Sequence, residues 1–397
     1  MENEPFEEEY IFKKLKEFKS KDLSYSSGRI LGSMCSEPHP LSKKVYMDFL
    51  DSNLGDHGLF EGTKAIEYEV INIIASFLSL DNPYGKVVTG GTEANIMAMR
   101  SARNLYKEIN KIKNQFIKPF EVIIPKSAHF SFKKASDMLG FKLVEIDLDD
   151  EYKMDIEYVK ENINKNTIAI VGVAGTTELG MIDPIEELSQ ISIDKNIYFH
   201  VDAAFGGFSI PFLNDIGYNL PNFDFSNDGV SSITIDPHKM GLTAIPAGCI
   251  IYRKKDYLDL ISVDSPYLTS KKQSTIVGTR SGAASAATWA MLKYMGKKGY
   301  RELANSCMIN TNFLADALFK EGFNLVTKPQ LNIVGFNHPK IEIDDLIKAI
   351  EYKSWKVSTT TYPKAVRIVI MPHIKHTHIM EFIKDLKEVK KEFINTN

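Results

Sequence analysis

The feature that most constrains the fold is an alternation of short apolar segments with amphipathic ones between about residues 64 and 252. Short apolar runs suited to buried strands lie at 86–88, 120–124, 142–146, 168–173, 197–201, 232–235 and 249–252. Segments with a helical spacing of apolar residues separate most of these runs, at 93–106, 130–139, 156–163 and 184–193. This alternation predicts an α/β fold, in which a mainly parallel seven-stranded sheet is covered by helices on both faces.

The sequence on either side of this region predicts smaller units. Helical patterns lie at 7–20, 283–293, 307–321, 344–352 and 376–392, and strand patterns lie at 332–336, 355–359 and 366–371. An irregular stretch rich in Gly, Ser and Pro, 26–40, follows the first of these helices. We therefore expect an N-terminal segment over 1–60, a large domain over 61–295 and a small α+β domain over 296–397.

Charge and cysteine content exclude several classes of protein. Lys and Arg total 48 against 51 Asp and Glu, so the net charge of -3 supplies no general field for nucleic acid or a membrane surface. The three cysteines form no CxxC pair, which argues against a metal site or a disulfide framework. The first ten residues are acidic, unlike a signal peptide, and no apolar run approaches the roughly 18 residues of a membrane helix. We expect a cytoplasmic protein.

Two charged residues stand at the ends of predicted strands. Lys239 follows the sixth strand in the segment DPHK, and a lysine amine can form an imine with an aldehyde cofactor when it is deprotonated. The alternative is an ordinary lysine on a surface loop. Asp202 ends the fifth strand in HVDAAFGG, where a carboxylate binds a metal, caps a helix or pairs with a buried cation such as a protonated ring nitrogen. The absence of neighbouring carboxylates in the sequence disfavours the metal.

Three further polar segments follow other strands. TGGTEAN (89–95) leads from a strand into a helix, and its glycines with the helix N-terminus predict a phosphate cradle. A threonine N-cap beside a glycine turn is the alternative. Because the segment matches neither a Walker A loop nor a GxGxxG fingerprint, the phosphate should belong to a ligand smaller than a nucleotide. AHFS (128–131) carries a histidine suited either to stacking on a ring or to an ordinary loop, and GTTELG (175–180) is a polar turn.

These five segments follow five strands, and the carboxyl ends of parallel strands meet at one edge of a sheet. Their order resembles that of the group II decarboxylases that depend on pyridoxal 5′-phosphate (PLP), which are members of fold type I. The resemblance is strongest to the archaeal L-tyrosine/L-aspartate decarboxylases. It extends to SGRILGSMCSEPHP (27–40), LGDHGLFEGT (54–63) and GTRSGAASA (278–286), and so covers nearly the whole chain. It implies an aspartate aminotransferase-like fold, PLP as cofactor and no metal.

The resemblance assigns roles around the cofactor ring by matching motif. Lys239 would hold the cofactor as an imine, and Asp202 would pair with the pyridine nitrogen while Ala204 lies against the ring. His129 would stack on the opposite face. Thr177 would sit at the edge where the substrate binds.

The resemblance also assigns the phosphate site and a partner. Gly91, Thr92 and His238 would hold the phosphate. Thr279 would reach the phosphate of a neighbouring subunit, which implies an obligate homodimer with shared active sites.

Substrate contacts are expected from two other regions. The resemblance places the segment that contains Ser33, Met34 and His39 at the substrate pocket. Arg367 is expected to bind the substrate carboxylate, because it interrupts the apolar run 365–371, where a charge is costly unless paired, and its guanidinium suits a carboxylate. The alternative is an edge-strand arginine that points to water.

Two positions depart from the pattern of relatives. Animal aromatic amino acid decarboxylases carry a long loop with a catalytic tyrosine ahead of the GTRSG-like segment, whereas this chain has only a short stretch there. Tyr267 is therefore only a candidate for the group that returns a proton to Cα. Asp236 stands where relatives often have Ser or Asn, and its role is left open.

The resemblance implies decarboxylation of an L-amino acid. L-Tyrosine to tyramine, as in methanofuran biosynthesis, is the favoured reaction. L-Aspartate to β-alanine, as in coenzyme A biosynthesis, and L-glutamate decarboxylation are alternatives. A C–C lyase like sphingosine-1-phosphate lyase is disfavoured by the lack of a membrane anchor, and a tRNA-directed PLP enzyme by the net charge and scattered cysteines. The pair of Lys239 and Asp202 argues against a non-catalytic PLP-binding module.

Overall fold

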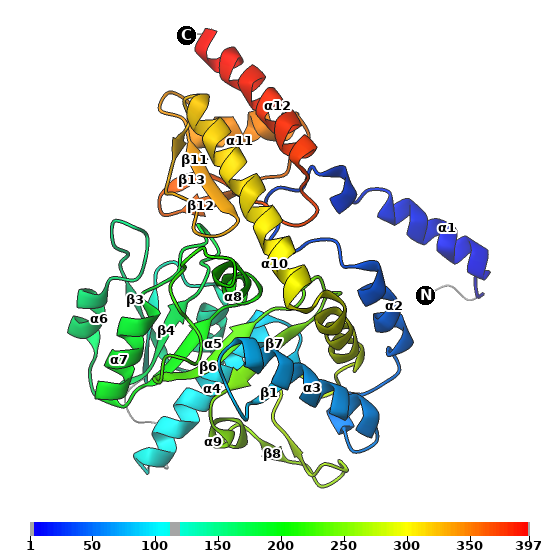
Figure 1. The fold of residues 1–397 in the computed structure, drawn as a ribbon. Helices are drawn as coiled ribbons and strands as arrows, with labels where there is room; N and C mark the ends of the chain where they lie inside the picture. Colours follow the sequence, from blue (N-terminus) through cyan, green and yellow to red (C-terminus); the bar gives the residue numbers. More distant parts are fainter. Residues whose placement is uncertain (1–3, 112–119, 396–397) are drawn as a thin grey trace.

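The computed structural model describes residues 4–111 and 120–395. Its largest element is a seven-stranded sheet in the order β1-β7-β6-β5-β4-β2-β3 (Figure 1). The strands are β1 (Tyr84–Val88), β2 (Glu121–Pro125), β3 (Lys142–Ile146), β4 (Thr167–Val173), β5 (Tyr198–Asp202), β6 (Val230–Ile235) and β7 (Gly248–Tyr252). Strands β2 to β6 are parallel, and β7 is antiparallel to both of its neighbours, so β1 runs in the common direction. The predicted α/β class and the mainly parallel sheet are confirmed.

Helices cover both faces of this sheet. The helices on one face are α3 (Glu61–Phe77), α6 (Ile156–Asn162), α7 (Ile185–Lys195), α8 (Ile210–Asn214) and α10 (Ala283–Lys320) as far as Met308. Those on the other are α4 (Gly91–Ile109), α5 (Ser131–Leu139) and α9 (Lys255–Asp259). Successive strand residues face opposite sides, so Ile170 packs in the first core and Val171 in the second. This double burial explains why the strands read as continuous apolar runs.

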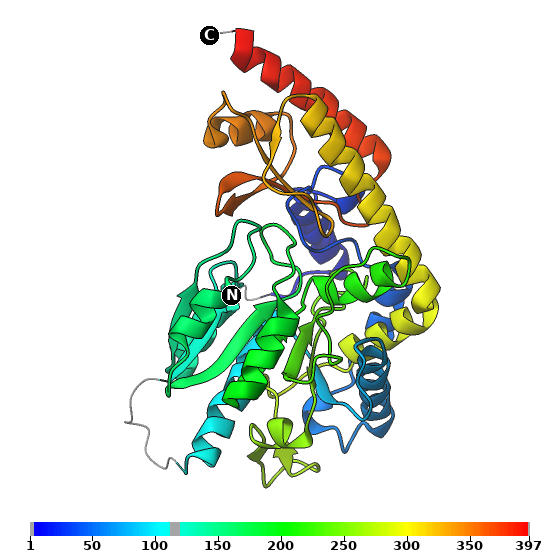
Figure 2. The ribbon, with the colours of Figure 1, turned by 60° about the vertical axis from the view of Figure 1, so that its left-hand side comes forward.

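A second, antiparallel sheet lies at the far end of α10, which bends at Gly296 where φ is 52° (Figures 1 and 2). Its order is β10-β11-β13-β12, with β10 (Asn324–Leu325), β11 (Ile333–Asn337), β12 (Ser358–Thr361) and β13 (Lys364–Val369). One face of this small sheet packs on α11 (Ile343–Tyr352), α12 (His376–Asn395) and the second half of α10. Ile333 and Val369 on its opposite face pack in the core of the large sheet.

The N-terminal region contributes a helix and a strap. Helix α1 (Glu8–Lys19) projects from the body, and none of its residues is buried (Figure 1). The N-terminal strap, residues 28–39, then runs from the small sheet to the large one. The amide of Leu31 donates to the carbonyl of Lys356 at 2.7 Å, and the amide of His39 donates to the carbonyl of Leu242 at 3.1 Å. The strap therefore ties the two sheets together.

The structure departs from the predicted elements in a few places. Helices α2 (Pro40–Asp48) and α3 lie outside the expected elements, and α3 is rich in Ile and Val, whose intrinsic preference is for strands. The strand expected over 355–359 starts only at Ser358, because Ser354 adopts a left-handed φ of 65° and Trp355 packs against Phe382 beneath the sheet. Over the described ranges, no helix combines the length and apolarity needed to cross a membrane.

Candidate active site

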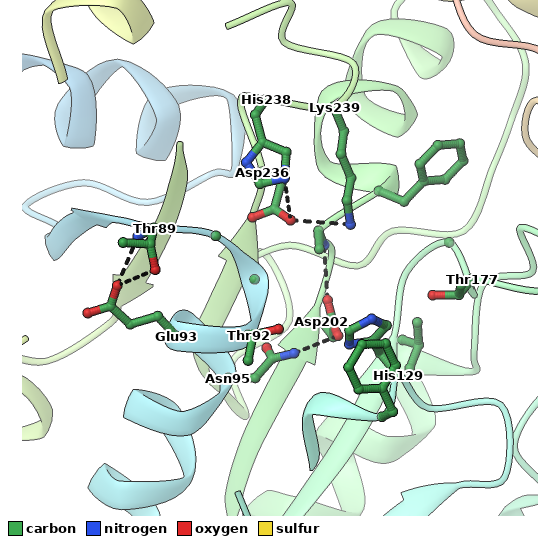
Figure 3. Close-up of a pocket in the computed structure, with 17 residues that line it drawn as sticks. Thr89, Thr92, Glu93, Asn95, His129, Thr177, Asp202, Asp236, His238 and Lys239 are labelled. Atoms are coloured by element: carbon green, nitrogen blue, oxygen red, sulfur yellow. Dashed lines mark hydrogen bonds and ion pairs between the residues drawn. The ribbon is translucent and has the colours of Figure 1, made fainter. Parts of the chain in front are cut away.

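The five polar segments line one pocket at the carboxyl edge of the large sheet (Figure 3). This strand-end pocket has a volume of about 300 Å³. Its lining includes Gly91 and Thr92 after β1, His129 after β2, Thr177 after β4, Asp202 and Ala204 at the end of β5, and His238 and Lys239 after β6. The parallel topology brings together residues that are up to about 150 positions apart in the chain, as the sequence predicted.

Glycines shape the wall where α4 begins. Gly90 has a φ of 145°, which side chains rarely allow, and a Cβ at this position would lie 3.1 Å from the His238 ring. A Cβ on Gly91 would lie 3.0 Å from a carboxylate oxygen of Asp236. The backbone therefore approaches the pocket closely, with the N-terminal amides of α4 and their partial positive charge beside it. This arrangement fits a phosphate group.

Lys239 lies in the turn after β6, at the top of the pocket in Figure 3. Its Nζ is 3.2 Å from Oδ2 of Asp236, a carboxylate that is almost fully buried. The neighbouring His238 accepts a hydrogen bond from the amide of Ala247 through Nδ1, and its Nε2 lies 3.6 Å from Asp236. The lysine amine is thus held inside the pocket and does not extend into solvent.

Asp202 faces the same pocket from the end of β5 and is 5% exposed. Its Oδ1 accepts a hydrogen bond of 3.1 Å from the amide of Ala204, and its Oδ2 accepts one of 2.8 Å from Asn95. Two donors therefore fix the orientation of the carboxylate. Each oxygen keeps a further lone pair for a donor on a bound ligand.

His129 forms part of the pocket wall after β2. Its Nδ1 accepts a hydrogen bond from the amide of Ser131 at 3.2 Å, and its ring lies 4.0 Å from that of Phe130. Burial lowers the pKa of His129, and the partly opposing effects of Asp202 and Lys239 are smaller. A neutral, oriented imidazole in this position is suited to stacking on an aromatic ring.

These groups match the parts of a phosphorylated pyridine aldehyde. An amine can form an imine with the aldehyde, a carboxylate can hold the ring nitrogen protonated, and the glycine turn can hold the phosphate. The residues present therefore fit PLP.

Arg367 is buried on the face of the small sheet that points toward the large one. It is 5% exposed and lies on β13, an interior strand, so the alternative of an edge-strand arginine pointing to water is wrong. Its Nη1 donates to the carbonyl of Gly32 at 3.0 Å and to Oγ of Ser358 at 2.9 Å. Nε and Nη2 are buried and have no partner within the described part of the chain. Burial lowers the pKa of Arg367 to about 10, against a smaller raising effect of Glu178.

Like Arg367, four other residues expected at the site lie outside the lining of the strand-end pocket. Ser33 and His39 are part of the strap, where Ser33 Oγ accepts from the amide of Cys35 and His39 Nδ1 accepts from the amide of Leu41. Tyr267 is 84% exposed on the hairpin of β8 (Val263–Asp264) and β9 (Lys272–Gln273), and Thr279 is also exposed. Within a single chain, these four side chains do not complete the pocket.

Sequence reasoning missed several residues that hold the site in place. Asn95 was part of a recognised motif, yet its contact with Asp202 depends on the packing of α4 against β5. Glu93 accepts hydrogen bonds from the amides of Ile276 and Val277, both at 3.1 Å, and so ties the start of α4 to the segment before Thr279. Glu178 accepts from two amides of the small sheet. Only the motif membership of these residues signalled their importance.

A buried ion pair anchors the GTRSG segment. Arg280 Nη1 lies 2.6 Å from Oε1 of Glu67, which also accepts from the amide of Val87 at 3.1 Å. Lys86 lies 3.2 Å from the other oxygen of Glu67. This cluster links α3, β1 and the start of α10, and so fixes the position of Thr279.

Comparison with known proteins shows where this arrangement recurs. Residues 63–338 match the family model described as the pyridoxal-dependent decarboxylase conserved domain. The chain is 54% identical to a probable L-tyrosine/L-aspartate decarboxylase of Methanothermobacter thermautotrophicus, over 93% of this chain and 99% of the relative. It is 48% identical to an L-aspartate decarboxylase of Thermococcus kodakarensis, over 97% of each chain.

A solved structure shows the same fold at lower identity. The sphingosine-1-phosphate lyase of Burkholderia pseudomallei superposes with a TM-score of 0.92 at 24% identity, covering all of this chain and 93% of the other. At this level of identity the likeness concerns the fold alone.

Proposed function

Because this chain belongs to the pyridoxal-dependent decarboxylase family, and is therefore a PLP-dependent carboxy-lyase acting on an amino acid, we propose that it converts L-tyrosine to tyramine and CO2. The observation that carries this choice is the composition of the strand-end pocket. Among the described lining residues Lys239 is the sole lysine and there is no arginine. The cofactor would occupy that lysine, so the lining of the strand-end pocket offers no permanent cation to a second substrate carboxylate, and Arg367, which lies outside this lining, is assigned below to the first.

The residues of the pocket take separate tasks toward the cofactor. Lys239 would form the covalent bond with PLP, Asp202 would hold its ring nitrogen protonated beside Ala204, and His129 would stack on the ring. Gly91, Thr92 and His238 would hold the phosphate, and Thr177 would border the substrate; all of these residues line the pocket. Bound PLP supplies an electron sink for the pair left at Cα when CO2 departs. The protein contributes the orientation of the Cα–carboxylate bond and the charge opposite the ring nitrogen.

Arg367 is the proposed partner of the substrate α-carboxylate. Its two unpartnered nitrogens are adjacent donors of one guanidinium, which is the pattern that a carboxylate accepts in two parallel hydrogen bonds. A buried guanidinium with free donors is costly unless a ligand satisfies them. Its place on the face toward the large sheet, beside the strap that carries Ser33 and His39, supports this role.

L-Aspartate is the second candidate, because a relative that shares 48% of its residues with this chain is named an L-aspartate decarboxylase. That substrate needs a second cation, which a neighbouring subunit would have to supply. L-Glutamate is the third candidate. Names of relatives at about half identity favour decarboxylation over the C–C lyase reaction of sphingosine-1-phosphate lyase.

The deciding measurement is kcat/KM for L-tyrosine, L-aspartate and L-glutamate with the PLP-loaded enzyme. We expect L-tyrosine to lead by more than tenfold, and a lead of L-aspartate would overturn the choice. Failure to release CO2 from any amino acid in a broad panel would overturn the proposal as a whole. Arg367→Met should raise KM about 100-fold, the cost of leaving a carboxylate without its buried partner. In Lys239→Ala, both turnover and the absorbance of the covalently bound cofactor should be lost.

We further propose a cytoplasmic homodimer with shared sites, in which Thr279 reaches the partner's phosphate and Tyr267 lies near the partner's substrate. The exposure of both residues outside the pocket of their own chain supports this arrangement. Mixing Lys239→Ala and Thr279→Asp subunits tests it, since one site of the hybrid dimer would combine an intact lysine with an intact threonine. Recovery of activity in the hybrid is expected, and its absence would contradict shared sites.

A further inference from the structure

A line of buried polar side chains runs from Asp202 into the interior of the large sheet. Asn95 Nδ2 lies 2.8 Å from Asp202 Oδ2, as Figure 3 shows, and Asn95 Oδ1 lies 3.0 Å from Nε2 of His200. His200 Nδ1 lies 2.8 Å from Oγ of Ser232, which accepts from the hydroxyl of Tyr198 at 2.7 Å. We call Tyr198, Ser232, His200 and Asn95 the donor chain. All four are buried.

Asn95 is saturated, and this fixes the orientation of its amide. Its nitrogen donates to Asp202 and, at 3.0 Å, to the hydroxyl of Ser131. Its oxygen faces His200 and accepts from the hydroxyl of Thr234 at 2.7 Å. An amide has two donors and two acceptor positions, so every one is used. The flipped amide would set its oxygen against the Asp202 carboxylate.

The orientation of Asn95 determines the tautomer of His200. Nε2 faces an acceptor, the Asn95 oxygen, and must therefore carry a hydrogen. Burial, which outweighs the effect of Asp202, lowers the pKa of His200 to about 4, so the ring is neutral near pH 7. Its Nδ1 then has a free lone pair and accepts the hydroxyl hydrogen of Ser232. In each of these hydrogen bonds, the neighbouring group thus determines which atom carries the hydrogen.

Every hydrogen bond in the line points the same way. Tyr198 donates to Ser232, Ser232 to His200, His200 to Asn95, and Asn95 to Asp202. We propose that Asn95 and His200 are positioning residues, and that this donor chain holds Asp202 as a hydrogen-bond acceptor aimed at the ring nitrogen of PLP. The inference rests on the proposed role of Asp202 opposite that nitrogen.

The physical effect follows from the direction and the burial of the chain. Aligned hydrogen bonds polarise one another in a medium of low dielectric constant, and here the positive ends point at Asp202. The Asn95 amide and the Ala204 N–H each direct a hydrogen at one oxygen of Asp202, so both oxygens are held as acceptors in a fixed orientation. The group opposite the ring nitrogen is therefore set before the cofactor binds, which avoids reorganisation during the reaction.

If the role of the donor chain were purely structural, its residues would only hold α4 against β5 and β6. The two roles differ in what they do to the cofactor. Loss of a structural contact changes stability and PLP occupancy, whereas loss of a positioning residue changes the electronic state of the ring while PLP stays bound. The 15N chemical shift of PLP labelled at its ring nitrogen reports this state directly.

The experiment compares holoenzymes of the wild type, His200→Phe, Ser232→Ala and Tyr198→Phe, with Asp202→Asn as the reference for a lost carboxylate. We expect the 15N shift of His200→Phe to lie between those of the wild type and Asp202→Asn. Its kcat should fall about 10- to 100-fold with KM unchanged, the scale seen when residues that orient a site ligand are removed. Ser232→Ala and Tyr198→Phe should move the shift less and in the same direction.

Tyr252→Phe is the matched control, because Tyr252 is a buried strand tyrosine whose hydroxyl accepts a hydrogen bond from Ser101 and, within the described part of the protein, forms none with the donor chain. If His200→Phe binds PLP but keeps the wild-type shift and kcat, the inference is overturned. If His200→Phe does not fold, the comparison of Tyr198→Phe with Tyr252→Phe decides, and identical spectra overturn it. An unprotonated ring nitrogen in the wild type would instead contradict the role of Asp202 itself.

Discussion

The amine nitrogen of Lys239 lies 3.2 Å from one carboxylate oxygen of Asp236, and the other oxygen is buried with no hydrogen-bond partner within the described ranges. The carboxylate also borders the glycine turn, since a Cβ on Gly91 would lie 3.0 Å from it. A buried negative charge thus lies between the reactive amine and the cradle proposed for a phosphate.

Replacing Asp236 should therefore change the affinity for PLP. In a Lys239→Ala background, where no covalent bond forms, we expect Asp236→Asn to bind PLP about tenfold more tightly, because a carboxylate repels the phosphate. Calorimetric titration with PLP measures the dissociation constant. Asp228→Asn, which removes an exposed carboxylate outside the pocket, should leave the constant unchanged. Equal or weaker binding by Asp236→Asn would show that this carboxylate does not face the phosphate.

The ion pair of Glu67 with Arg280 should matter for stability. Glu67→Gln leaves the Arg280 guanidinium buried beside a neutral amide, and breaking such a pair costs about 3–5 kcal/mol of unfolding free energy. Denaturant unfolding of the apoenzyme measures this loss. Glu69→Gln on the same helix breaks an exposed pair with Lys293 and should cost less than about 1 kcal/mol. Equal losses in both variants would contradict the prediction.

The same pair predicts a dependence on pH. Burial alone would raise the pKa of Glu67, but Arg280 and Lys86 outweigh it and hold that pKa at about 2. A lowered pKa in the folded state means that the stabilisation is complete above the ordinary value of 4.5 and is lost as the pH falls toward 2. The difference in unfolding free energy between the wild type and Glu67→Gln should therefore shrink across this window. A difference that stays constant from pH 6 to pH 3 would contradict the assignment.

Glu178 should couple the small sheet to the substrate site. Its carboxylate accepts from the amides of Thr361 and Tyr362 at 3.1 and 3.3 Å, and its own loop carries Thr177. We expect Glu178→Ala to raise KM about tenfold with a smaller change in kcat, because the hairpin that leads into Arg367 loses its anchor. Hydrogen exchange at residues 361–362 should accelerate. Glu186→Ala, an exposed glutamate of α7, serves as the control and should change neither quantity.

Helix α1 should contribute to dimer stability. Phe12 and Phe18 are 61% and 65% exposed, and a second copy of the chain would bury such side chains. Phe12→Asp together with Phe18→Asp should weaken the dimer about 100-fold, as measured by sedimentation equilibrium. Tyr352→Asp, at an even more exposed aromatic of α11, should leave the dissociation constant as in the wild type. An unchanged dimer in the α1 variant would place the interface elsewhere.

Much of the architecture followed from local pattern. The seven strands of the large sheet lie within a few residues of their predicted positions, because residues buried on both sides form apolar runs bounded by turns. The boundaries of the individual elements were less predictable. Trp355 reads as a strand residue, yet it packs beneath the small sheet against Phe382, which lies far along the chain.

The convergence of Gly91, His129, Thr177, Asp202 and Lys239 was also predictable, since topology fixes which strand ends share an edge. The contacts of the residues that support the site were not predictable. Asn95 and His200 belong to recognised motifs, but the motif letters do not show that their side chains meet inside the sheet. The sequence marks Arg367 as a charge in an apolar run, while its burial without partners for two nitrogens became evident only in three dimensions.

By itself, the sequence determined the fold class, the order of the elements and the family, because these depend on periodicity and on motifs that are local in the chain. The tertiary structure alone decided that a fixed line of donors ends at Asp202, that Asp236 lies against Lys239, and that Arg367 is buried with free donors. The reason is physical: hydrogen-bond direction and the burial of a charge depend on distances between segments, which no single stretch of sequence contains.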